Sequence, residues 1–516
     1  MRSTMLPIVL ALGCGRIDFD PVGGSANPTP DAPPPPQRWY IKASNTGAND
    51  QFGSGIALSA DGMTLAVSAQ GEASAARGID GDQNDDSAAG AGAVYVFTRI
   101  GTTWTQQAYL KASNAEAGDR FGGHICLSAD GSTLAVGAED EASAATGVNG
   151  NQADNSASRS GAVYVFARTG TSWEQQAYIK ASNTETTDLF GYRFALSRDG
   201  ATLVVGSTKE DSAATGINGN QASNTASTAG AAYVYVRTGS TWSQQAYLKA
   251  SNTDAGDDYG GGVGVSADGS TIAVGATFED SAATGINGNQ ASNTFEKAGA
   301  VYVYTRSGGV WSQQAYVKAS NTGAGDWFGA SLSLSSDGST LAVAAWLESG
   351  GAPGVNGDQT SDAAAGAGAV YVFTRSGIVW SQQAYLKASN PGPLDSFGID
   401  LVLTPDGSRL VVGARFEDSD ATGLDGDDTN DAATSAGAAY VFDRSGATWS
   451  ARGYVKAYNT GADDELGTSV AVSADGELIA VGAPGEASAA TGIDGDMDDD
   501  SLPNAGAAYV FTLDDL

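Results

Sequence analysis

The sequence has very few of the residues that disulfide staples and histidine-based sites require. Of its 516 residues, two are cysteine and one is histidine. Cys14 and Cys126 allow at most one disulfide. His124 alone cannot build a Ser-His-Asp triad or a histidine-rich metal centre. Chemistry by two carboxylates, as in glycosidases, stays open, but no pair stands out among the 59 Asp and Glu residues. We therefore expect a protein that is not an enzyme.

Basic charge and long apolar runs are also scarce. The chain has 26 Lys and Arg against 59 Asp and Glu, a net charge of −33. Nucleic acid and anionic membrane surfaces both need a basic face, so the charge argues against them and permits cations or basic partners. No stretch after the N-terminus approaches the roughly 20 apolar residues of a membrane span. We expect contact with a membrane only through an N-terminal anchor.

The first 37 residues differ from the rest of the chain. "MRSTMLPIVLALGCG" has a short apolar run that ends at Gly13-Cys14, and it resembles a bacterial lipoprotein signal. The resemblance implies that residues 1–13 are removed and that Cys14 is lipidated. Ordinary secretion and an uncleaved N-terminus are the alternatives. We expect export across the inner membrane and a cell-envelope lipoprotein, on the outer membrane or cell surface. The Pro-rich residues 14–37 predict a disordered tether.

What the chain has in abundance is glycine, with 70 residues, and repetition. Tyr-x-Lys-Ala recurs every 69 residues, and so does an aromatic residue followed by Gly. The Tyr-x-Lys-Ala copies begin at Tyr40, Tyr109, Tyr178, Tyr247, Tyr316, Tyr385 and Tyr454. The paired residues are Phe52, Phe121, Phe190, Tyr259, Phe328 and Phe397, with Leu466 in the seventh place. A fixed period in perfect register predicts a repeat architecture.

One unit contains four strand patterns. Residues 52–60 alternate and end at Asp-Gly, residues 63–69 follow, and "GAVYVFTR" and "WTQQAYLKAS" come after a loop of about twenty residues. Seven such units predict an all-β, seven-bladed β-propeller of four-stranded antiparallel blades over residues 38–516. The array begins with a lone fourth strand at 38–44 and ends after a third strand. We therefore expect residues 38–44 to complete the last blade and close the ring. Cys126 falls in a strand and should be a small buried side chain.

The "FG…GAVYVF" pattern, with "VGA" between and "VGAP" once at Val481–Pro484, resembles FG-GAP repeats. Such repeats build the propeller head of integrin alpha chains and occur in many bacterial surface proteins. The resemblance is specific for the fold and implies an integrin-like binding module. Integrin-type calcium loops lie between the first and second strands. Here "SADGST" leaves only a tight turn at that place, so calcium binding does not carry over there.

Two acidic positions recur in all seven units on the expected loop-rich face. One is Asp50, Asp119, Asp188, Asp257, Asp326, Asp395 and Asp464; the other is Glu72, Glu141, Glu210, Glu279, Glu348, Glu417 and Glu486. They can form a ring of cation ligands. Alternatively, each Asp caps its own turn and each Glu pairs with the Lys of Tyr-x-Lys-Ala. A residue needed identically in every blade favours the scaffold interpretation.

Specific function should lie where the symmetry breaks. Trp327, Trp346, Phe278 and Phe416 occupy variable positions of the loop face and are candidates for stacking on a sugar or anchoring a protein; covering a neighbouring loop is the alternative. One inner-strand position also varies and either lines the central channel or tolerates variation. Its residues are Gly55, His124, Arg193, Gly262, Ser331, Asp400 and Ser469.

A fifteen-residue loop, "DSAATGINGNQASNT", occurs identically at 211–225 and 280–294. After its first residue it has no carboxylate, so these copies are poor calcium sites and indicate scaffold. The equivalent loops of blades six, seven and one are acidic, and closure makes these blades neighbours. Calcium is therefore the expected cofactor there, and a solvating acidic patch is the alternative. The candidate ligands are Asp80, Asp82, Asp425, Asp427, Asp494, Asp496 and Asp498.

These observations favour a monomeric, envelope-anchored propeller that binds a protein or a carbohydrate on its loop face, with possible stabilisation by calcium. A structural spacer or surface module without a specific ligand is the alternative. A carboxylate-dependent hydrolase or lyase is the third interpretation.

Overall fold

The computed structural model describes residues 38–513. The chain divides into two compact units at residues 35 and 36, and every described residue belongs to the second unit. The predicted signal peptide, the lipidation site at Cys14 and the tether all lie outside the described residues. The part of the chain that the structure describes holds no helix long and apolar enough to cross a membrane.

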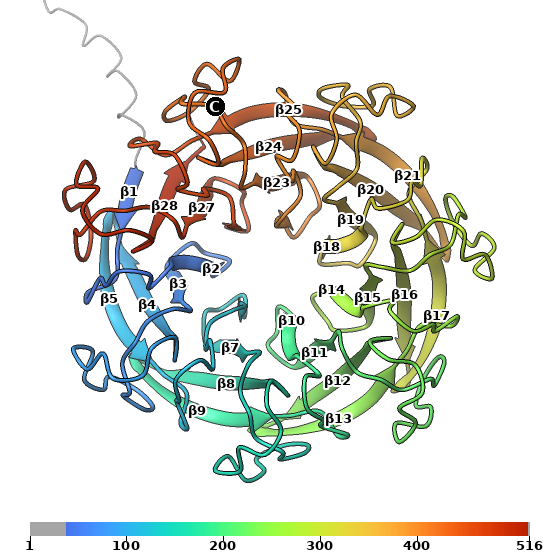
Figure 1. Cartoon of the computed structure of the whole chain (residues 1–516), viewed down its shortest axis with the longest axis horizontal. Helices are drawn as coiled ribbons and strands as arrows, with labels where there is room; N and C mark the ends of the chain where they lie inside the picture. Colours follow the sequence, from blue (N-terminus) through green and yellow to red (C-terminus); the bar gives the residue numbers. More distant parts are fainter. Residues whose placement is uncertain (1–37, 514–516) are drawn as a thin grey trace, which may run out of the picture. The chain divides into compact units, whose positions relative to one another are not determined.

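The described strands form seven four-stranded antiparallel sheets arranged as a ring (Figure 1). In the first six blades the strands follow chain order from the central channel outward. The first blade is β2 (Phe52–Leu58), β3 (Thr64–Ala69), β4 (Ala93–Ile100) and β5 (Thr103–Leu110). The second is β6 (Ile125–Leu127), β7 (Thr133–Ala138), β8 (Ala162–Thr169) and β9 (Ser172–Ile179). The third is β10 (Phe190–Leu196), β11 (Thr202–Ser207), β12 (Ala231–Thr238) and β13 (Thr241–Leu248).

The remaining blades repeat this order. The fourth is β14 (Tyr259–Val265), β15 (Thr271–Ala276), β16 (Ala300–Ser307) and β17 (Val310–Val317). The fifth is β18 (Phe328–Leu334), β19 (Thr340–Ala345), β20 (Ala369–Ser376) and β21 (Val379–Leu386). The sixth is β22 (Leu401–Leu403), β23 (Arg409–Ala414), β24 (Ala438–Ser445) and β25 (Thr448–Val455). The seventh is β26 (Ser469–Val472), β27 (Leu478–Ala483), β28 (Ala507–Thr512) and β1 (Arg38–Ile41).

The ring closes as the sequence predicts. Strand β1 pairs antiparallel with β28, and Trp39 lies opposite Val510 in the ladder. Trp39, Tyr40 and Ile41 are all buried. Because β1 covers the outer edge of β28, the seventh blade has the same four strands as the others. The predicted seven-bladed β-propeller with N-terminal closure is therefore confirmed for residues 38–513.

The core lies between the blades. The second strand of each blade is buried along its length, except for the half-buried Arg409 of β23, because the neighbouring sheets cover both of its faces. Aromatic residues interlock there: the ring of Phe121, which precedes β6, lies 5.4 Å from that of Tyr164 in β8, and Tyr164 lies 5.2 Å from Tyr178 in β9. This packing sets the orientation of each blade and fixes the positions of the loops.

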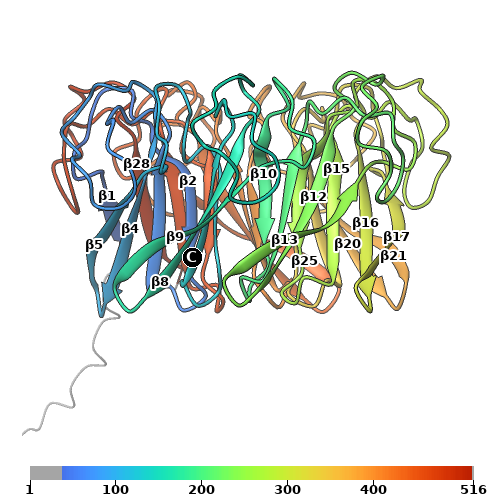
Figure 2. The ribbon, with the colours of Figure 1, turned by 90° about the horizontal axis from the view of Figure 1, so that it is seen from below.

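The two faces of the ring differ. One face, here named the loop face, carries the long connections between second and third strands together with the linkers between blades (Figure 2). The opposite face, named the turn face, carries short turns such as that at Asp130-Gly131. There the Asp130 side chain accepts hydrogen bonds from Ser132 N at 2.9 Å and Ser128 Oγ at 2.6 Å. The expected tight turn thus occupies the place of an integrin-type calcium loop.

Candidate functional site

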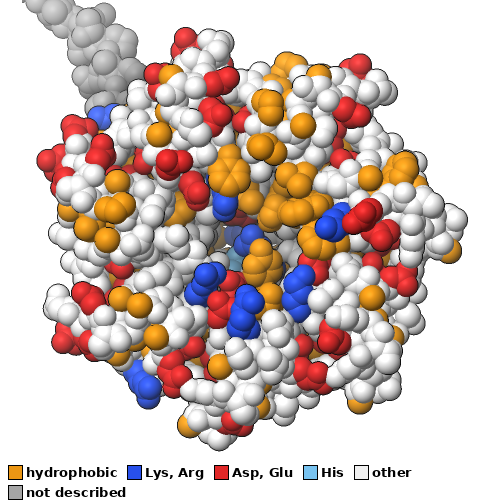
Figure 3. Space-filling view, in the orientation of Figure 1, with side chains coloured by type: hydrophobic (Ala, Val, Ile, Leu, Met, Phe, Trp, Pro, Cys, Tyr) orange, Lys and Arg blue, Asp and Glu red, His pale blue; other side chains and the backbone are white. Residues whose placement is uncertain are grey.

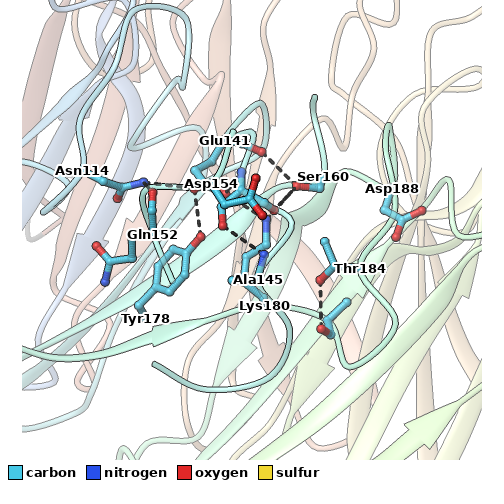
Figure 4. Close-up of polar contacts among 12 residues, drawn as sticks. Asn114, Glu141, Ala145, Gln152, Asp154, Ser160, Tyr178, Lys180, Thr184 and Asp188 are labelled. Atoms are coloured by element: carbon cyan, nitrogen blue, oxygen red, sulfur yellow. Dashed lines mark hydrogen bonds and ion pairs between the residues drawn. The ribbon is translucent and has the colours of Figure 1, made fainter. Parts of the chain in front are cut away.

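The recurring glutamate is the centre of a buried polar network, shown for the second blade in Figure 4. Glu141 Oε2 lies 2.8 Å from the Lys180 ammonium, and Glu141 Oε1 accepts hydrogen bonds from Tyr178 Oη at 2.8 Å and Asn114 Nδ2 at 3.0 Å. Lys180 also donates to Ser160 Oγ at 2.7 Å. Asn114 comes from the linker that enters the blade. One carboxylate therefore joins the linker, the loop and the outer strand.

The same ion pair occurs in all seven blades. The pairs join Lys Nζ to Glu Oε2 in Lys42–Glu486 and Lys111–Glu72 at 2.7 Å, Lys180–Glu141 and Lys456–Glu417 at 2.8 Å, Lys249–Glu210 and Lys318–Glu279 at 2.9 Å, and Lys387–Glu348 at 3.0 Å. Every one of these lysine side chains is 0% exposed. Because each glutamate is engaged by a lysine and closed off from solvent, the scaffold interpretation of this position is confirmed.

The recurring aspartate is a scaffold residue too. In each blade its Oδ2 atom accepts a hydrogen bond from the backbone N–H three residues earlier, at 2.6–2.9 Å. These side chains are buried. Burial raises the pKa of Asp188 to about 8, the backbone hydrogen bond opposes that rise, and the nearby Glu210 adds to it. The pKa values of Asp119, Asp257, Asp326, Asp395 and Asp464 rise to about 7 for the same main reason.

The verbatim loop is held by its first asparagine. Asn218 has a left-handed backbone with φ of 54°, its N–H donates to Tyr247 O at 2.8 Å, and its Oδ1 accepts from Tyr247 N at 3.0 Å. Asp or Asn makes the same side-chain bond in every blade, at 2.9–3.1 Å. Asn and Asp both tolerate this conformation and both supply the oxygen. The loop copied at 211–225 and 280–294 therefore serves as scaffold.

The predicted calcium ligands occupy these same scaffold positions. Asp80, Asp425 and Asp494 make the bond to the tyrosine N–H. Asp82, Asp427 and Asp496 each accept from the N–H two residues later, at 3.0 or 3.1 Å, and Asp498 provides one of these N–H groups. Within residues 38–513, no three Asp, Glu, His or Cys side chains gather as a metal site requires. Calcium at these loops stays a prediction.

Three of the four predicted aromatic residues come together between the fourth and fifth blades. The ring of Phe278 lies 5.0 Å from that of Trp327, which lies 6.4 Å from that of Trp346. All three side chains are half-buried. Phe416 is also half-buried, and the Arg415 guanidinium covers its ring at 4.2 Å.

Two leucines that sequence reasoning missed lie near each other at the fifth blade, and Leu347 directly follows Trp346 in the chain. Leu394 is 62% exposed, and both Leu394 and Leu347 lie against Gly366. We name Phe278, Trp327, Trp346, Leu347 and Leu394 the apolar patch. Figure 3 shows hydrophobic side chains gathered beside the central opening on this side of the loop face. The sequence feature that could have indicated this surface is Leu394, a leucine in the linker "NPGPLDS".

The channel brings together residues of the variable inner-strand position. His124, Arg193, Gly262, Ser331 and Asp400 line one cavity, so the channel-lining interpretation is confirmed for these five. Cys126 is half-buried and lines the channel below, with Sγ 3.4 Å from Phe194 O. Cys126 was predicted to be a small buried side chain; it is only half-buried, because its inner strand borders the channel while the side chain packs against the third blade.

Fold and network together define the class: a seven-bladed β-propeller of four-stranded antiparallel blades. Within that class, three segments, residues 104–166, 173–235 and 380–442, match the FG-GAP repeat model, so the chain carries FG-GAP repeats. Each matched segment begins at a fourth-strand tryptophan and ends at a third-strand aromatic residue of the next blade.

A solved structure similar to the chain is that of Kuenenia stuttgartiensis hydrazine synthase. The two are 14% identical with a TM-score of 0.45, over 86% of this chain and 94% of that chain. No curated protein matches the sequence.

Proposed function

We propose that the chain is a binding module that takes a protein partner on its loop face, at the apolar patch. The observation that carries the proposal is the position of the patch. It interrupts the seven-fold repetition, contains a strongly exposed leucine, and lies on the face that carries the long loops. Clustered aromatic and aliphatic side chains with a polar rim are typical of protein-binding surfaces.

The local chemistry favours a protein over a carbohydrate. Sugars stack on open aromatic ring faces, but the Lys297 and Lys209 ammonium groups already lie over the Phe278 ring at 5.2 and 5.8 Å. The tilted rings of Trp327 and Trp346 and the adjacent leucines form an uneven apolar surface. Such a surface suits apolar side chains of a partner, and the lysines suit acidic groups at its edge.

The test compares partner capture by the wild-type chain and by patch variants. Leu394→Asp and Trp327→Ala should abolish capture of a partner from envelope extracts of the source organism. Ile378→Asp should not, because Ile378 is 76% exposed but lies in a hairpin of the turn face. If the wild type and the three variants retained a partner equally, the result would contradict the proposal and favour a structural spacer without a specific ligand. Binding on a glycan array that depends on Trp327 would instead favour a carbohydrate ligand.

We also propose that Cys14 is lipidated. Strand β1 runs antiparallel to β28, and its first residue, Arg38, pairs with Phe511 near the turn face. The described propeller therefore begins, at Arg38, on the side opposite the apolar patch. Cys14→Ser should release the protein from the membrane fraction and leave the signal uncleaved. Unchanged fractionation of this variant would count against lipidation.

A further inference from the structure

The central channel holds opposite charges that do not meet. The Arg193 guanidinium makes its one side-chain hydrogen bond to His124 Nδ1, at 3.4 Å, although such a group has five donors. Among the described ion pairs, none includes Arg193 or Asp400. Asp400 instead accepts hydrogen bonds from the backbone N–H groups of Leu401 at 3.0 Å and Val470 at 2.9 Å.

His124 orients the arginine and adds no charge. Burial and the neighbouring guanidinium lower the pKa of His124 to about 3, so the ring is neutral at pH 7. Its Nε2 lies 3.0 Å from Phe194 O and donates the ring proton to that carbonyl, which leaves Nδ1 to accept from Arg193. Within residues 38–513 no second side-chain hydrogen bond of Arg193 is found, although its charge also acts on the carboxyl group of Glu139, so N–H groups of Arg193 remain for a ligand.

Arg193 and Asp400 line the same small cavity. Its volume is about 40 Å³, and its other walls include the small residues Gly262 and Ser331. A water molecule needs roughly 10–15 Å³ of such space, so the cavity holds a molecule of only a few heavy atoms. The channel continues into a wider stretch of about 260 Å³ that shares Asp400 and is lined mainly by apolar residues. In Figure 3 the opening on the loop face is hollow, with basic side chains around it and a histidine inside.

The charge pattern selects the class of ligand. A simple anion would meet the Asp400 carboxylate, and a simple cation would meet the Arg193 guanidinium. Each arrangement brings like charges together in a confined space, which is costly. A molecule with one positive and one negative group offers an opposite charge to each side chain, and the Arg193–Asp400 pair and such a ligand each carry no net charge.

We propose that the channel binds a small zwitterion, an α-amino acid of the size of glycine or alanine, with its carboxylate at Arg193 and its ammonium group at Asp400. Ser331 offers a further hydrogen-bonding hydroxyl on the cavity wall. The inference goes beyond the proposed partner at the apolar patch, since it concerns a different ligand in a different part of the molecule.

The single histidine is a natural reporter for this site. The chain contains one His, so in the full chain, prepared with labelled histidine and without a histidine tag, the ring signals in an NMR spectrum belong to His124. Titration with glycine at pH 7 should shift these signals until they saturate. Acetate and methylammonium, which carry one charge each, should leave them nearly unchanged at the same concentrations. Absence of a glycine shift overturns the proposal. An equal shift with acetate or methylammonium would show that the channel does not require a zwitterionic ligand, which also overturns it.

Two charge-removing variants test the assignment of the groups. Arg193→Gln and Asp400→Asn should each weaken glycine binding by about tenfold or more, since each removes a charged hydrogen-bond partner. Arg77→Gln and Asp86→Asn are matched controls at exposed positions outside the channel and should bind as the wild type does. The wild-type comparison of glycine with acetate and methylammonium needs no variant, so it decides the proposal even if a channel variant fails to fold. Equal glycine affinity in folded wild-type and channel variants would refute it.

Discussion

At the scale of single residues, the most repeated feature is a charge pair that solvent cannot reach. A buried ion pair contributes little net stability, but removal of one partner leaves the other charge uncompensated. The seven Lys–Glu pairs also bind a tyrosine hydroxyl in each blade. We infer that they hold linker, loop and outer strand in one arrangement, so that equivalent blades have equivalent loops.

The first prediction tests this pair in the third blade. Glu210 lies 2.9 Å from Lys249 and is 2% exposed, so Glu210→Gln leaves a buried ammonium without its counter-charge. We expect the free energy of unfolding, measured by denaturant titration, to fall by about 3–5 kcal/mol. Glu174→Gln, on the exposed face of β9, is the control and should change it by less than about 0.5 kcal/mol. Equal effects of the two substitutions would refute a structural role for the pair.

The second prediction concerns pH. The folded-state pKa of Asp188 is about 8, whereas an unfolded Asp titrates near 3.9. The folded state therefore binds this proton more strongly, so the contribution to stability is complete below about pH 4 and is lost as pH rises toward 8. The other raised turn aspartates act in the same direction. We expect the melting temperature to fall between pH 5 and pH 8 at constant ionic strength.

Asp188→Asn isolates one of these groups. The amide keeps an oxygen for the Glu185 N–H but does not titrate. Calorimetry of this variant should show a smaller loss of stability between pH 5 and pH 8 than the wild type shows. Asp154→Asn, at a half-buried position of the second-blade loop, should follow the wild-type profile. Identical profiles for wild type and Asp188→Asn would exclude Asp188 as a source of the pH dependence.

At the scale of elements, the long loops share a left-handed position that is occupied by neutral Asn in some blades and by Asp in others. Blades two to five have Asn at the left-handed position, and blades six, seven and one have Asp. The hydrogen bond to the tyrosine N–H is the same in both groups. The acidic loops therefore keep the anchoring bond of the amide loops and differ from them in charge.

The third prediction uses this equivalence to test calcium. Calcium at millimolar concentration should raise the melting temperature, because a ligand of the folded state stabilises it by mass action. Asp494→Asn with Asp496→Asn should remove much of that rise while keeping the loop bonds, since Asn makes them in other blades. Asn218→Ala should leave the calcium effect unchanged. No calcium binding by calorimetry would show that the loop is scaffold in every blade.

At the scale of the whole molecule, one strand joins the two ends of the array. Strand β1 brings Trp39, Tyr40 and Ile41 into the core and supplies Lys42, the partner of Glu486. Without it, β28 has an open edge and Glu486 is buried without a counter-charge. Open strand edges promote association between molecules.

The fourth prediction follows from this closure. Deletion of residues 1–44 should lower the melting temperature markedly and promote association, visible in size-exclusion chromatography as larger species. Deletion of residues 1–36 keeps all of β1 and should do neither. If both truncated proteins had the same melting temperature and stayed monomeric, closure by β1 would not contribute to stability.

The repeat period determined the architecture from the sequence alone. Strand patterns, Asp-Gly turns and the lone fourth strand at the start of the array are local features, and they predicted seven blades, four strands and closure. The scaffold role of Glu141 and its equivalents was one of two interpretations of the sequence. Only the structure decides between them, because a carboxylate can bind a lysine or a metal equally well. It shows the Lys180 ammonium 2.8 Å from Glu141, with both side chains buried.

The tertiary structure alone decided which symmetry-breaking residues meet. Leu394 lies beside Leu347 because neighbouring blades converge on Gly366. Arg193 and Asp400 belong to the third and sixth blades, yet line one cavity because the ring turns every inner strand toward the same axis. Local strand and turn preferences act over a few residues and repeat with the sequence. Contacts across the channel and between loops depend on the curvature of the closed ring, and no single repeat contains that information.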